Sequence, residues 1–355
     1  MGYMTYGGIQ KSLITFLQNL KDRAEIDLLL WGRAKEEMAL PEWVNIINVP
    51  TVKSVKAAKR ENGIFSKSFI LSCLGALCKK RWAVMPKLKK RYDIAIAYPQ
   101  VGYPKYYVID NVNAEKKYAF YHHGAYEFSE KIKAWDIEYY PKYDKLYCVS
   151  EHTRDILNKE FNTKICYDIM PNFLNIEEIC SKGQETFLWS GEGLKILTVA
   201  RLSVEKNIFK ILDVARLLKE KNIKFSWYIA GDGPLFANIK AKIEEENLQN
   251  YVFLLGNQKN PYKLMSACNV YAQFSQYEAD PITIKEVAIF NKPMVLSNII
   301  AFQKARESIN NIVLCDSVEE IAQTIMNIKE FSCKTNDLSR INAMFEQKLN
   351  EILGN

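Results

Sequence analysis

Residues 194–207 read LKILTVARLSVEKN, an apolar run followed by two cations. The first part, residues 195–200, has the composition of a strand buried on both faces of a parallel sheet. Arg201 and Lys206 follow its carboxyl end, the edge at which such sheets bind ligands. An Arg fork and a Lys point charge together suit a diphosphate. Taken alone, the pair fits two solvated surface charges better.

Short apolar, β-rich runs of this kind recur along the whole chain and alternate with helical patterns. The predicted strands of the first half are residues 26–31, 44–49, 92–98, 117–122, 145–150 and 164–170. Those of the second half are residues 195–200, 224–230, 251–255, 270–274, 293–297 and 311–315. Parallel strands with helices on both faces form doubly wound sheets. We therefore expect an α/β protein of two doubly wound domains of similar size that face each other across a cleft.

The polar stretch 176–193 contains three glycines and is the best candidate for a linker between these domains. We expect an N-terminal domain over residues 1–175, a C-terminal domain over 176–340 and a C-terminal helix over 341–355. The start of the chain is anomalous, because too few residues precede Gly7, Gly8 and the helical stripe of residues 9–20 to form a good strand. The first strand of a doubly wound sheet is central. We therefore expect the natural chain to begin a few residues upstream, or the domain to pack with a stub.

The composition indicates a soluble globular protein. The 355 residues are 48% hydrophobic and 25% charged, which excludes a disordered chain, a collagen and a disulfide-stapled miniprotein. The longest uncharged apolar stretch, residues 68–78, is too short to span a bilayer, and the N-terminus has no secretory pattern. None of the eight Cys residues forms a C-x-x-C pair. We interpret them as buried hydrophobes in a reducing compartment, and we expect a cytoplasmic protein.

One segment carries more than the whole net charge of +7. Residues 51–91 contain twelve Lys or Arg and one acid, Glu61, so the segment has a charge of +11 and the remaining chain −4. Its middle, residues 65–78, is apolar and aromatic. Two interpretations stay open: peripheral contact with the anionic inner face of the cell membrane, or a core helix with solvated lysines at both ends. We do not expect nucleic acid as a partner, because no recognisable nucleic-acid-binding module is present.

Two further loops in the second half contain residues suited to ligand binding. The strand 224–230 runs into Gly231-Asp232-Gly233-Pro234, where glycines permit a tight turn and close approach of backbone to a ligand. The strand 270–274 leads to Glu278 and then Glu286. Pro281 suits the first turn of a helix, which places Glu278 in the loop and Glu286 inside the helix. Two such carboxylates can bind different hydroxyls of one extended ligand, although each pattern by itself is common.

In order and spacing, these motifs resemble the retaining glycosyltransferases of family four, which have the GT-B fold of two Rossmann-like domains. The matching segments of the second half are residues 199–207, 230–234, 253–256, 275–286 and 291–295. The first half matches more loosely, at residues 7–13, 121–126, 148–151 and 170–173. The resemblance covers most of the chain except about residues 51–88.

The resemblance assigns the donor site mainly to the second half. Arg201 and Lys206 would bind the donor diphosphate and stabilise it as it leaves. Glu286 would bind the nucleotide ribose, and Glu278 the hydroxyls of the donor sugar. The further positions that it places at the donor are Gly231, Gly233, Ala279, Asp280, Pro281 and Ile282.

In the first half the resemblance places His123 beside the reacting sugar, with His122 as the alternative. Gly7 and Gly8 would let the N-terminal loop approach the phosphates or the acceptor. Two positions depart from the family pattern: Ala279 replaces the usual glycine after the first glutamate, and Ala125 replaces a common acidic or amide residue. Both departures bear on sugar specificity more than on activity.

The implied reaction moves a hexose-type sugar from a nucleotide diphosphate sugar, UDP-linked rather than GDP-linked, to a glycan or lipid-linked acceptor of a surface polysaccharide such as a capsule. No D-x-D motif occurs, and Asp136-Ile137-Glu138 is only a near miss. We therefore expect no metal and no other cofactor, with Arg201 and Lys206 taking the place of a cation on the diphosphate. Two alternatives are a sugar-nucleotide epimerase or hydrolase of the same fold, and a non-catalytic two-domain ligand-binding protein.

Overall fold

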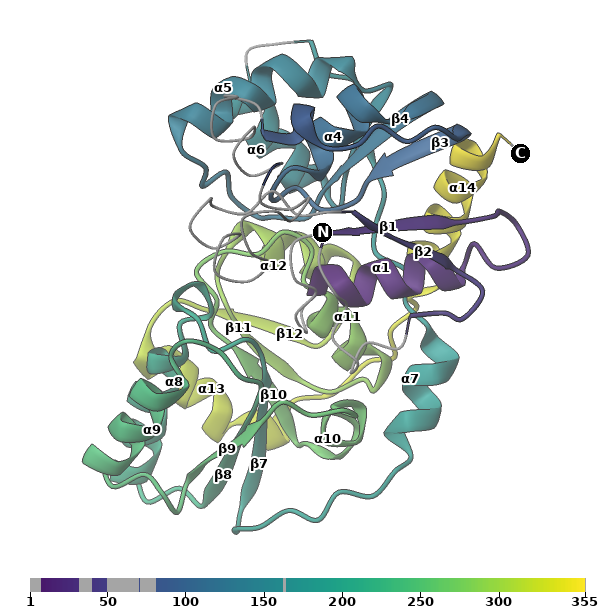
Figure 1. The fold of residues 1–355 in the computed structure, drawn as a ribbon. Helices are drawn as coiled ribbons and strands as arrows, with labels where there is room; N and C mark the ends of the chain where they lie inside the picture. The colour runs from purple at the N-terminus through teal and green to yellow at the C-terminus, as the bar shows by residue number, and fades with distance from the viewer. Residues whose placement is uncertain (1–7, 32–39, 50–69, 71–80, 162–163, 355) are drawn as a thin grey trace. The chain divides into compact units, whose positions relative to one another are not determined.

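Twelve strands form three parallel sheets in the residues that the computed structural model describes, 8–31, 40–49, 70, 81–161 and 164–354 (Figure 1). The chain divides into two compact units, Met1–Phe173 and Leu174–Asn355. All twelve strands coincide with runs predicted from the sequence, with ends that differ by a few residues. The predicted α/β class with parallel sheets is therefore confirmed.

The second unit contains a six-stranded sheet in the order β12-β11-β10-β7-β8-β9, with every neighbouring pair parallel. Its strands are β7 (Leu194–Val199), β8 (Phe225–Ala230), β9 (Val252–Gly256), β10 (Val270–Gln273), β11 (Met294–Ser297) and β12 (Ile312–Cys315). From β7 the chain first builds outward through β8 and β9, and then returns to add β10 on the other side of β7. The carboxyl ends of β7 and β10 therefore flank a topological switch point, where doubly wound sheets bind ligands.

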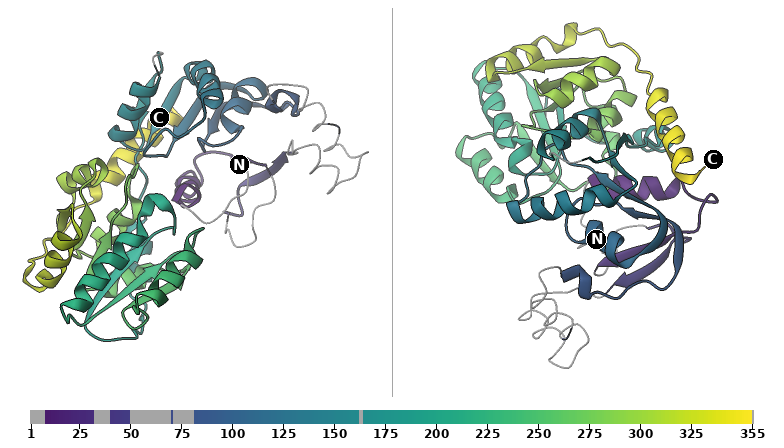
Figure 2. Two further views of the ribbon diagram at one scale, coloured as in Figure 1. Left: turned by 90° about the vertical axis from the view of Figure 1, so that its left-hand side faces the viewer. Right: turned by 90° about the horizontal axis from the view of Figure 1, so that it is seen from above.

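Helices cover both faces of this sheet (Figure 2). Those on one face are α8 (Ile208–Glu220), α9 (Phe236–Glu245) and α13 (Val318–Met326). Those on the other are α7 (Ile176–Gly183), α10 (Tyr262–Ala267), α11 (Ile282–Ile289) and α12 (Ile300–Ser308). The unit is completed by α14 (Ser339–Leu353) and the 3₁₀ helices η3 (Val204–Lys206) and η4 (Ile328–Glu330).

The stretch expected to be a linker begins with a helix, so this prediction was wrong for Ile176–Gly183. Asn175 caps α7: its side-chain oxygen accepts from the backbone N–H of Glu178 at 3.1 Å, and its amide donates to the Glu178 carboxylate at 3.0 Å. Ile179 is buried in the core on that face of the sheet. A reciprocal cap and one buried apolar residue are enough to stabilise two helical turns here.

Among its described residues, the first unit contains two separate parallel sheets, β3-β4-β5-β6 and β1-β2. The strands are β1 (Asp27–Trp31), β2 (Asn45–Val49), β3 (Arg91–Ala97), β4 (Asn113–Tyr121), β5 (Lys145–Cys148) and β6 (Tyr167–Ile169). The helices are α1 (Gly8–Gln18), α4 (Pro104–Asn111), α5 (Glu130–Tyr139), α6 (Glu151–Glu160) and the 3₁₀ helices η1 (Arg81–Val84) and η2 (Tyr140–Lys142).

The larger of these sheets is covered on both faces. On one face, Phe16 of α1 contacts the rings of Tyr98 and Phe120, with centroid distances of 5.5 and 5.7 Å. On the other face, α4, α5 and α6 pack through a largely aromatic core that includes Tyr107 and also the aliphatic Leu157. Because both faces are covered, this unit is doubly wound like the second.

A cavity of about 130 Å³, lined mainly by apolar residues, lies between β1 and β3. At one end, the carboxylate of Asp27 accepts hydrogen bonds from Lys90 and Tyr92, both at 2.9 Å. These side-chain bonds join the start of β1 to the start of β3. The expectation of an incomplete opening strand concerns residues 1–7, which lie outside the described residues.

Most of the basic segment also lies outside the described residues, which include only Ile70 and residues 81–91 of it. The membrane and core-helix interpretations of that segment therefore both stay predictions. No helix in the described ranges has the length and apolar character that crossing a membrane would require.

Candidate active site

Three loops meet at the carboxyl edge of the sheet in the second unit, beside the switch point. They are the cation loop after β7 (residues 200–207), the glycine loop after β8 (residues 231–235) and the carboxylate loop after β10 (residues 275–281). Backbone hydrogen bonds join the first to both of the others. The N–H of Leu202 donates to the carbonyl of Asp232 at 3.0 Å, and the N–H of Gln276 donates to the carbonyl of Glu205 at 2.8 Å.

Lys206 and Glu278 form an ion pair between the cation loop and the carboxylate loop. The Nζ of Lys206 lies 2.5 Å from Oε1 of Glu278, and the two side chains are 20% and 11% exposed. Lys206 ends η3, and Asn207 after it has a left-handed φ of 50° that starts α8. The structure thus brings together two of the predicted site residues, although 72 positions separate them in the sequence.

The carboxylate of Glu278 is held by two further donors. The amide of Gln273 donates to Oε1 at 2.6 Å, and the hydroxyl of Ser275 donates to the same oxygen at 2.7 Å. The hydroxyl of Ser297 fixes this loop in turn by donating to the carbonyl of Ser275 at 2.6 Å. All three donors to Glu278, including Lys206, use Oε1, so Oε2 is the oxygen that these bonds leave for a ligand. The sequence analysis did not identify Gln273. The feature that could have indicated it is a polar amide within an otherwise apolar strand.

Arg201 is exposed, and its guanidinium makes no side-chain hydrogen bond within the described part of the chain. Its charge acts on Glu205 in the same loop. Burial opposes ionisation of that carboxyl, but the Ser203 hydroxyl, the backbone N–H of Glu205 and the charges of Lys206 and Arg201 together hold its pKa below the ordinary value. Glu205 therefore stays ionised and braces the loop from within, while Arg201 is available to an anion.

Gly231 and Gly233 bring the glycine loop against the cation loop. A Cβ on Gly231, whose φ is +145°, would lie 1.9 Å from the carbonyl oxygen of Ala200. A Cβ on Gly233 would lie 2.4 Å from the carbonyl oxygen of Leu202. The predicted close approach is present, but in this structure the backbone approached is that of the cation loop. Both glycines therefore position the loop that carries Arg201 and Lys206.

The carboxylate loop leads through Ala279, Asp280 and Pro281 into α11, which begins at Ile282. Pro281 was expected in the first helical turn and instead occupies the N-cap position immediately before it. Asp280 forms an ion pair with Lys285 that is about one-tenth exposed on both sides.

Glu286 lies inside α11, as predicted, and is 2% exposed. The hydroxyl of Tyr262 on α10 donates to its Oε1 at 3.3 Å. Helix packing therefore fixes where this carboxylate sits beside the loop.

In the first unit, both candidate histidines follow the carboxyl end of β4. The His122 ring stacks on Phe120 and contacts Tyr98, and its Nε2 donates to the carbonyl of Tyr98 at 3.1 Å. The Nδ1 of His123 donates to the carbonyl of Ala125 at 2.9 Å, within the turn. His122 is thus held by the aromatic face of the sheet, and His123 by its own loop. Gly8 is the first residue of α1 and is exposed, whereas Gly7 lies outside the described residues.

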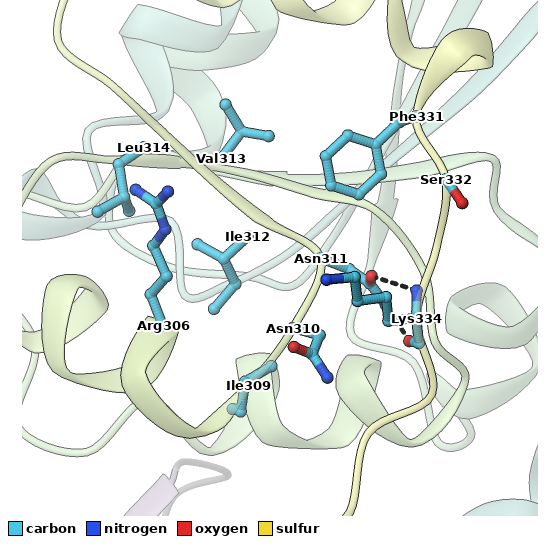
Figure 3. A pocket seen from close by; sticks show the side chains of 10 residues that line it. All are labelled: Arg306, Ile309, Asn310, Asn311, Ile312, Val313, Leu314, Phe331, Ser332 and Lys334. Atoms are coloured by element: carbon cyan, nitrogen blue, oxygen red, sulfur yellow. Dashed lines mark hydrogen bonds between the residues drawn. The ribbon is translucent and has the colours of Figure 1, made fainter.

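A cavity of about 500 Å³ lies away from these loops, along the edge strand β12 (Figure 3). Asn311 exchanges two hydrogen bonds of 2.7 Å with the backbone of Lys334, which ties residues 331–334 to this edge. None of the predicted site residues is among the residues that line the cavity. It belongs to the packing of this edge rather than to the switch point.

The described residues contain no cluster of three or more His, Cys, Asp or Glu placed to hold a metal ion. Asp136, the first residue of the D-x-D near miss, is completely buried and lies 2.7 Å from the Nζ of Lys105, itself 2% exposed. Its charge is therefore used inside the first unit. Within the three described loops, the positively charged side chains are those of Arg201 and Lys206.

Residues 184–341, which include all three loops, match the family model Glycosyl transferases group 1. Over most of its length, the second unit is therefore similar to the group 1 glycosyl transferases. Over 141 residues the chain is 33% identical to an N-acetylgalactosaminyltransferase of Campylobacter jejuni that acts on a diphospho-undecaprenol-linked sugar, covering 39% of this chain and 37% of that protein. It is 28% identical to the poly(ribitol-phosphate) alpha-N-acetylglucosaminyltransferase of Staphylococcus aureus, covering 64% and 47%. The chain thus spans less than half the length of the curated relatives it matches.

The solved structures resemble this chain in fold over both of its units. HepE from Anabaena, in complex with UDP-glucose, superposes with a TM-score of 0.69 at 14% identity, covering 98% of this chain and 97% of that one. TarM from S. aureus, in complex with UDP, gives a TM-score of 0.56 at 22% identity, covering 81% and 55%. The chain has the GT-B fold, as expected from its motifs.

Proposed function

We propose that this chain is a retaining glycosyltransferase that moves a hexose-type sugar from a nucleotide diphosphate sugar to a glycan or lipid-linked acceptor in the synthesis of a cell-surface polysaccharide. The observation that carries the proposal is the Lys206–Glu278 pair beside the switch point of a domain similar to the group 1 glycosyl transferases. One member offers a positive charge to a diphosphate, and the other offers oxygens to sugar hydroxyls. HepE was solved with UDP and glucose, and the pneumococcal O-GlcNAc transferase GtfA with UDP and GlcNAc, which supports a UDP-sugar donor.

The chemistry follows from charge. Breaking the bond between the sugar and the phosphate builds an oxocarbenium-like sugar and a more negative diphosphate. Preorganised cations in a water-poor site stabilise that leaving group more than water does. In this proposal Lys206 and Arg201 stabilise the departing diphosphate, and Glu278 holds the sugar hydroxyls so that the bond to be broken stays aligned.

The other residues complete the proposed site. Glu286 binds the ribose hydroxyls from α11, and the backbone of residues 279–282 lies near the sugar and phosphate. In this proposal His123 acts beside the reacting sugar. Its ring is held by its own turn, whereas the ring of His122 is stacked on Phe120, which favours His123 over His122. In this proposal Gly8, the first residue of α1, would let the start of that helix approach the phosphates or the acceptor, whereas Gly7 lies outside the described residues and stays a prediction.

We expect sugar transfer to persist in EDTA. The reason is that two protein cations, rather than carboxylates of a D-x-D motif, neutralise the diphosphate in this proposal. The measurement is release of UDP with and without the chelator. Loss of turnover that Mn²⁺ restores would contradict metal independence while leaving the transferase assignment intact.

We expect one class of donor to stand out in a thermal-shift screen of UDP-, GDP- and ADP-sugars, with a UDP-sugar stabilising most. A ligand that binds only the folded state at about 100 times its Kd raises the melting temperature of a protein of this size by about 5 °C. No shift with any nucleotide sugar, together with no turnover, would contradict the proposed function.

Consumption of an acceptor distinguishes the proposed transferase from the alternative, a sugar-nucleotide hydrolase. A sugar-nucleotide hydrolase of the same fold would release free nucleotide without consuming an acceptor. A transferase releases free nucleotide in proportion to the glycosylated product.

A lipid-linked acceptor would place the reaction at the inner face of the membrane, where the basic segment 51–91 suits peripheral docking.

A further inference from the structure

Gln273 is a buried amide at the carboxyl end of a strand that is otherwise apolar or aromatic. It is 2% exposed, and Val270, Tyr271 and Ala272 before it on β10 are completely buried. A buried amide costs free energy unless its hydrogen bonds are made. Its neighbours show where those bonds go.

Every hydrogen-bonding group of the Gln273 side chain has a partner. Its Nε2 donates to Oε1 of Glu278 at 2.6 Å and to the hydroxyl of Ser275 at 3.0 Å. Its Oε1 accepts from the hydroxyl of Tyr271 at 2.7 Å and from that of Thr283 on α11 at 3.3 Å. The amide oxygen faces two hydroxyl donors and the amide nitrogen faces the Glu278 carboxylate, so only one orientation of the amide satisfies all of these hydrogen bonds.

The network reaches back to the strand that precedes the cation loop. The hydroxyl of Tyr271 also accepts a hydrogen bond from the backbone N–H of Val199, the last residue of β7, at 3.4 Å. Burial raises the pKa of the Tyr271 phenol, so the hydroxyl stays protonated and able to donate. Hydrogen bonds therefore connect Val199, at the end of β7, through Tyr271 and Gln273 to Glu278. Glu278 in turn forms the ion pair with Lys206.

We propose that Gln273 is a positioning residue that sets the orientation of the Glu278 carboxylate for the donor sugar. The inference rests on the proposed role of Glu278 in donor binding. With Gln273, Ser275 and Lys206 all directed at Oε1, the carboxylate cannot rotate without losing three donors. Oε2 is then presented in a constant direction as the acceptor for a sugar hydroxyl.

Two substitutions test this role in the full-length protein. Gln273→Met keeps the length of the side chain and removes the donor to Glu278. Because the Glu278 carboxylate then loses one of its three donors, we expect kcat/KM for the donor to fall at least tenfold. Gln273→Glu places a second carboxyl against Glu278, where two like charges raise the pKa of the pair.

The dependence of kcat/KM on pH in Gln273→Glu distinguishes a positioning role from a merely structural one, because a structural defect would not change with pH. The titratable groups around position 273 are Tyr271 on β10, Glu278 on the next loop, Lys206 on η3 and Glu286 on α11. A proton shared between residues 273 and 278 replaces the amide donor at low pH and is lost as pH rises. We expect this variant to approach wild-type kcat/KM near pH 6 and to fall at least tenfold below it near pH 8.5.

Gln249→Glu is the matched control, because it makes the same change on an exposed side chain before the edge strand β9, three strands away from β10. Its ratio to wild type should stay constant with pH. Melting curves establish that each variant is folded. Full activity of Gln273→Met, or a constant ratio for Gln273→Glu across this pH range, would overturn the inference while wild-type turnover upholds the proposed function. Absence of turnover in the wild type with every donor would overturn both.

Discussion

In the proposed function, we expect Lys206→Ala to transfer sugar about 100-fold more slowly than wild type, since removal of one preorganised donor to a developing negative charge costs about 3 kcal/mol. The departing diphosphate then has only Arg201 from this loop to stabilise it. The substitution also leaves Glu278, 11% exposed, without its ionic partner. The measurement is kcat at saturating donor, with the melting temperature as the test that the fold survives.

Lys210→Ala is the control for this experiment. Lys210 lies four residues further on, in the first turn of α8, and its Nζ donates to the backbone carbonyl of Asp316 rather than to a site residue. It should transfer sugar at the wild-type rate. A wild-type rate in Lys206→Ala would remove the proposed diphosphate role from this residue.

Gly231→Ala should destabilise the second unit by about 3 kcal/mol or more, since a strained φ adds to overpacking against backbone. The new Cβ would lie 1.9 Å from the carbonyl oxygen of Ala200 at a φ of +145°. Because that oxygen belongs to the main chain of the cation loop, no side chain can rotate to relieve the clash. Urea unfolding followed by tryptophan fluorescence, to which Trp189 and Trp227 of this unit contribute, measures the change.

Gly256→Ala separates strain from crowding. Its φ of +64° is also left-handed, but nothing lies within 4 Å of the added Cβ. We expect a loss of about 1–2 kcal/mol from strain alone. Equal losses for the two variants would show that contact between the glycine loop and the cation loop contributes nothing to stability.

Most of the fold could be predicted because strand patterns are local. The runs around Ile196 and Trp227 are continuous and apolar, as two covered faces of a sheet require. The segment at Ile176 was misread because its capping pair, Asn175 and Glu178, is polar and resembles a loop. The burial of Ile179, which together with the cap stabilises the helix, depends on segments far apart in the chain and is not visible in the sequence.

The candidate site could be predicted in its parts and not in its connections. Arg201, Lys206 and Glu278 follow strands, where ligands bind, and Glu286 lies in the next helix, but only the family resemblance assigned all four to one donor site. The pairing of Lys206 with Glu278 depends on β10 lying beside β7, a neighbour relation between strands far apart in the chain. The roles of Gly231 and Gln273 likewise depend on loops that meet only in the folded sheet.

The ion pair of Lys206 with Glu278 has a consequence for which solutes this site accepts. Without a ligand, the charge of Lys206 is already balanced, so the site exerts less pull on any passing anion than two bare cations would. Inorganic phosphate can replace only one half of the pair and leaves the glutamate unmatched. A nucleotide sugar, in the proposed function, supplies a phosphate for the lysine and hydroxyls for the glutamate at once. In the proposed function, the ion pair would therefore favour a nucleotide sugar over inorganic phosphate at this site.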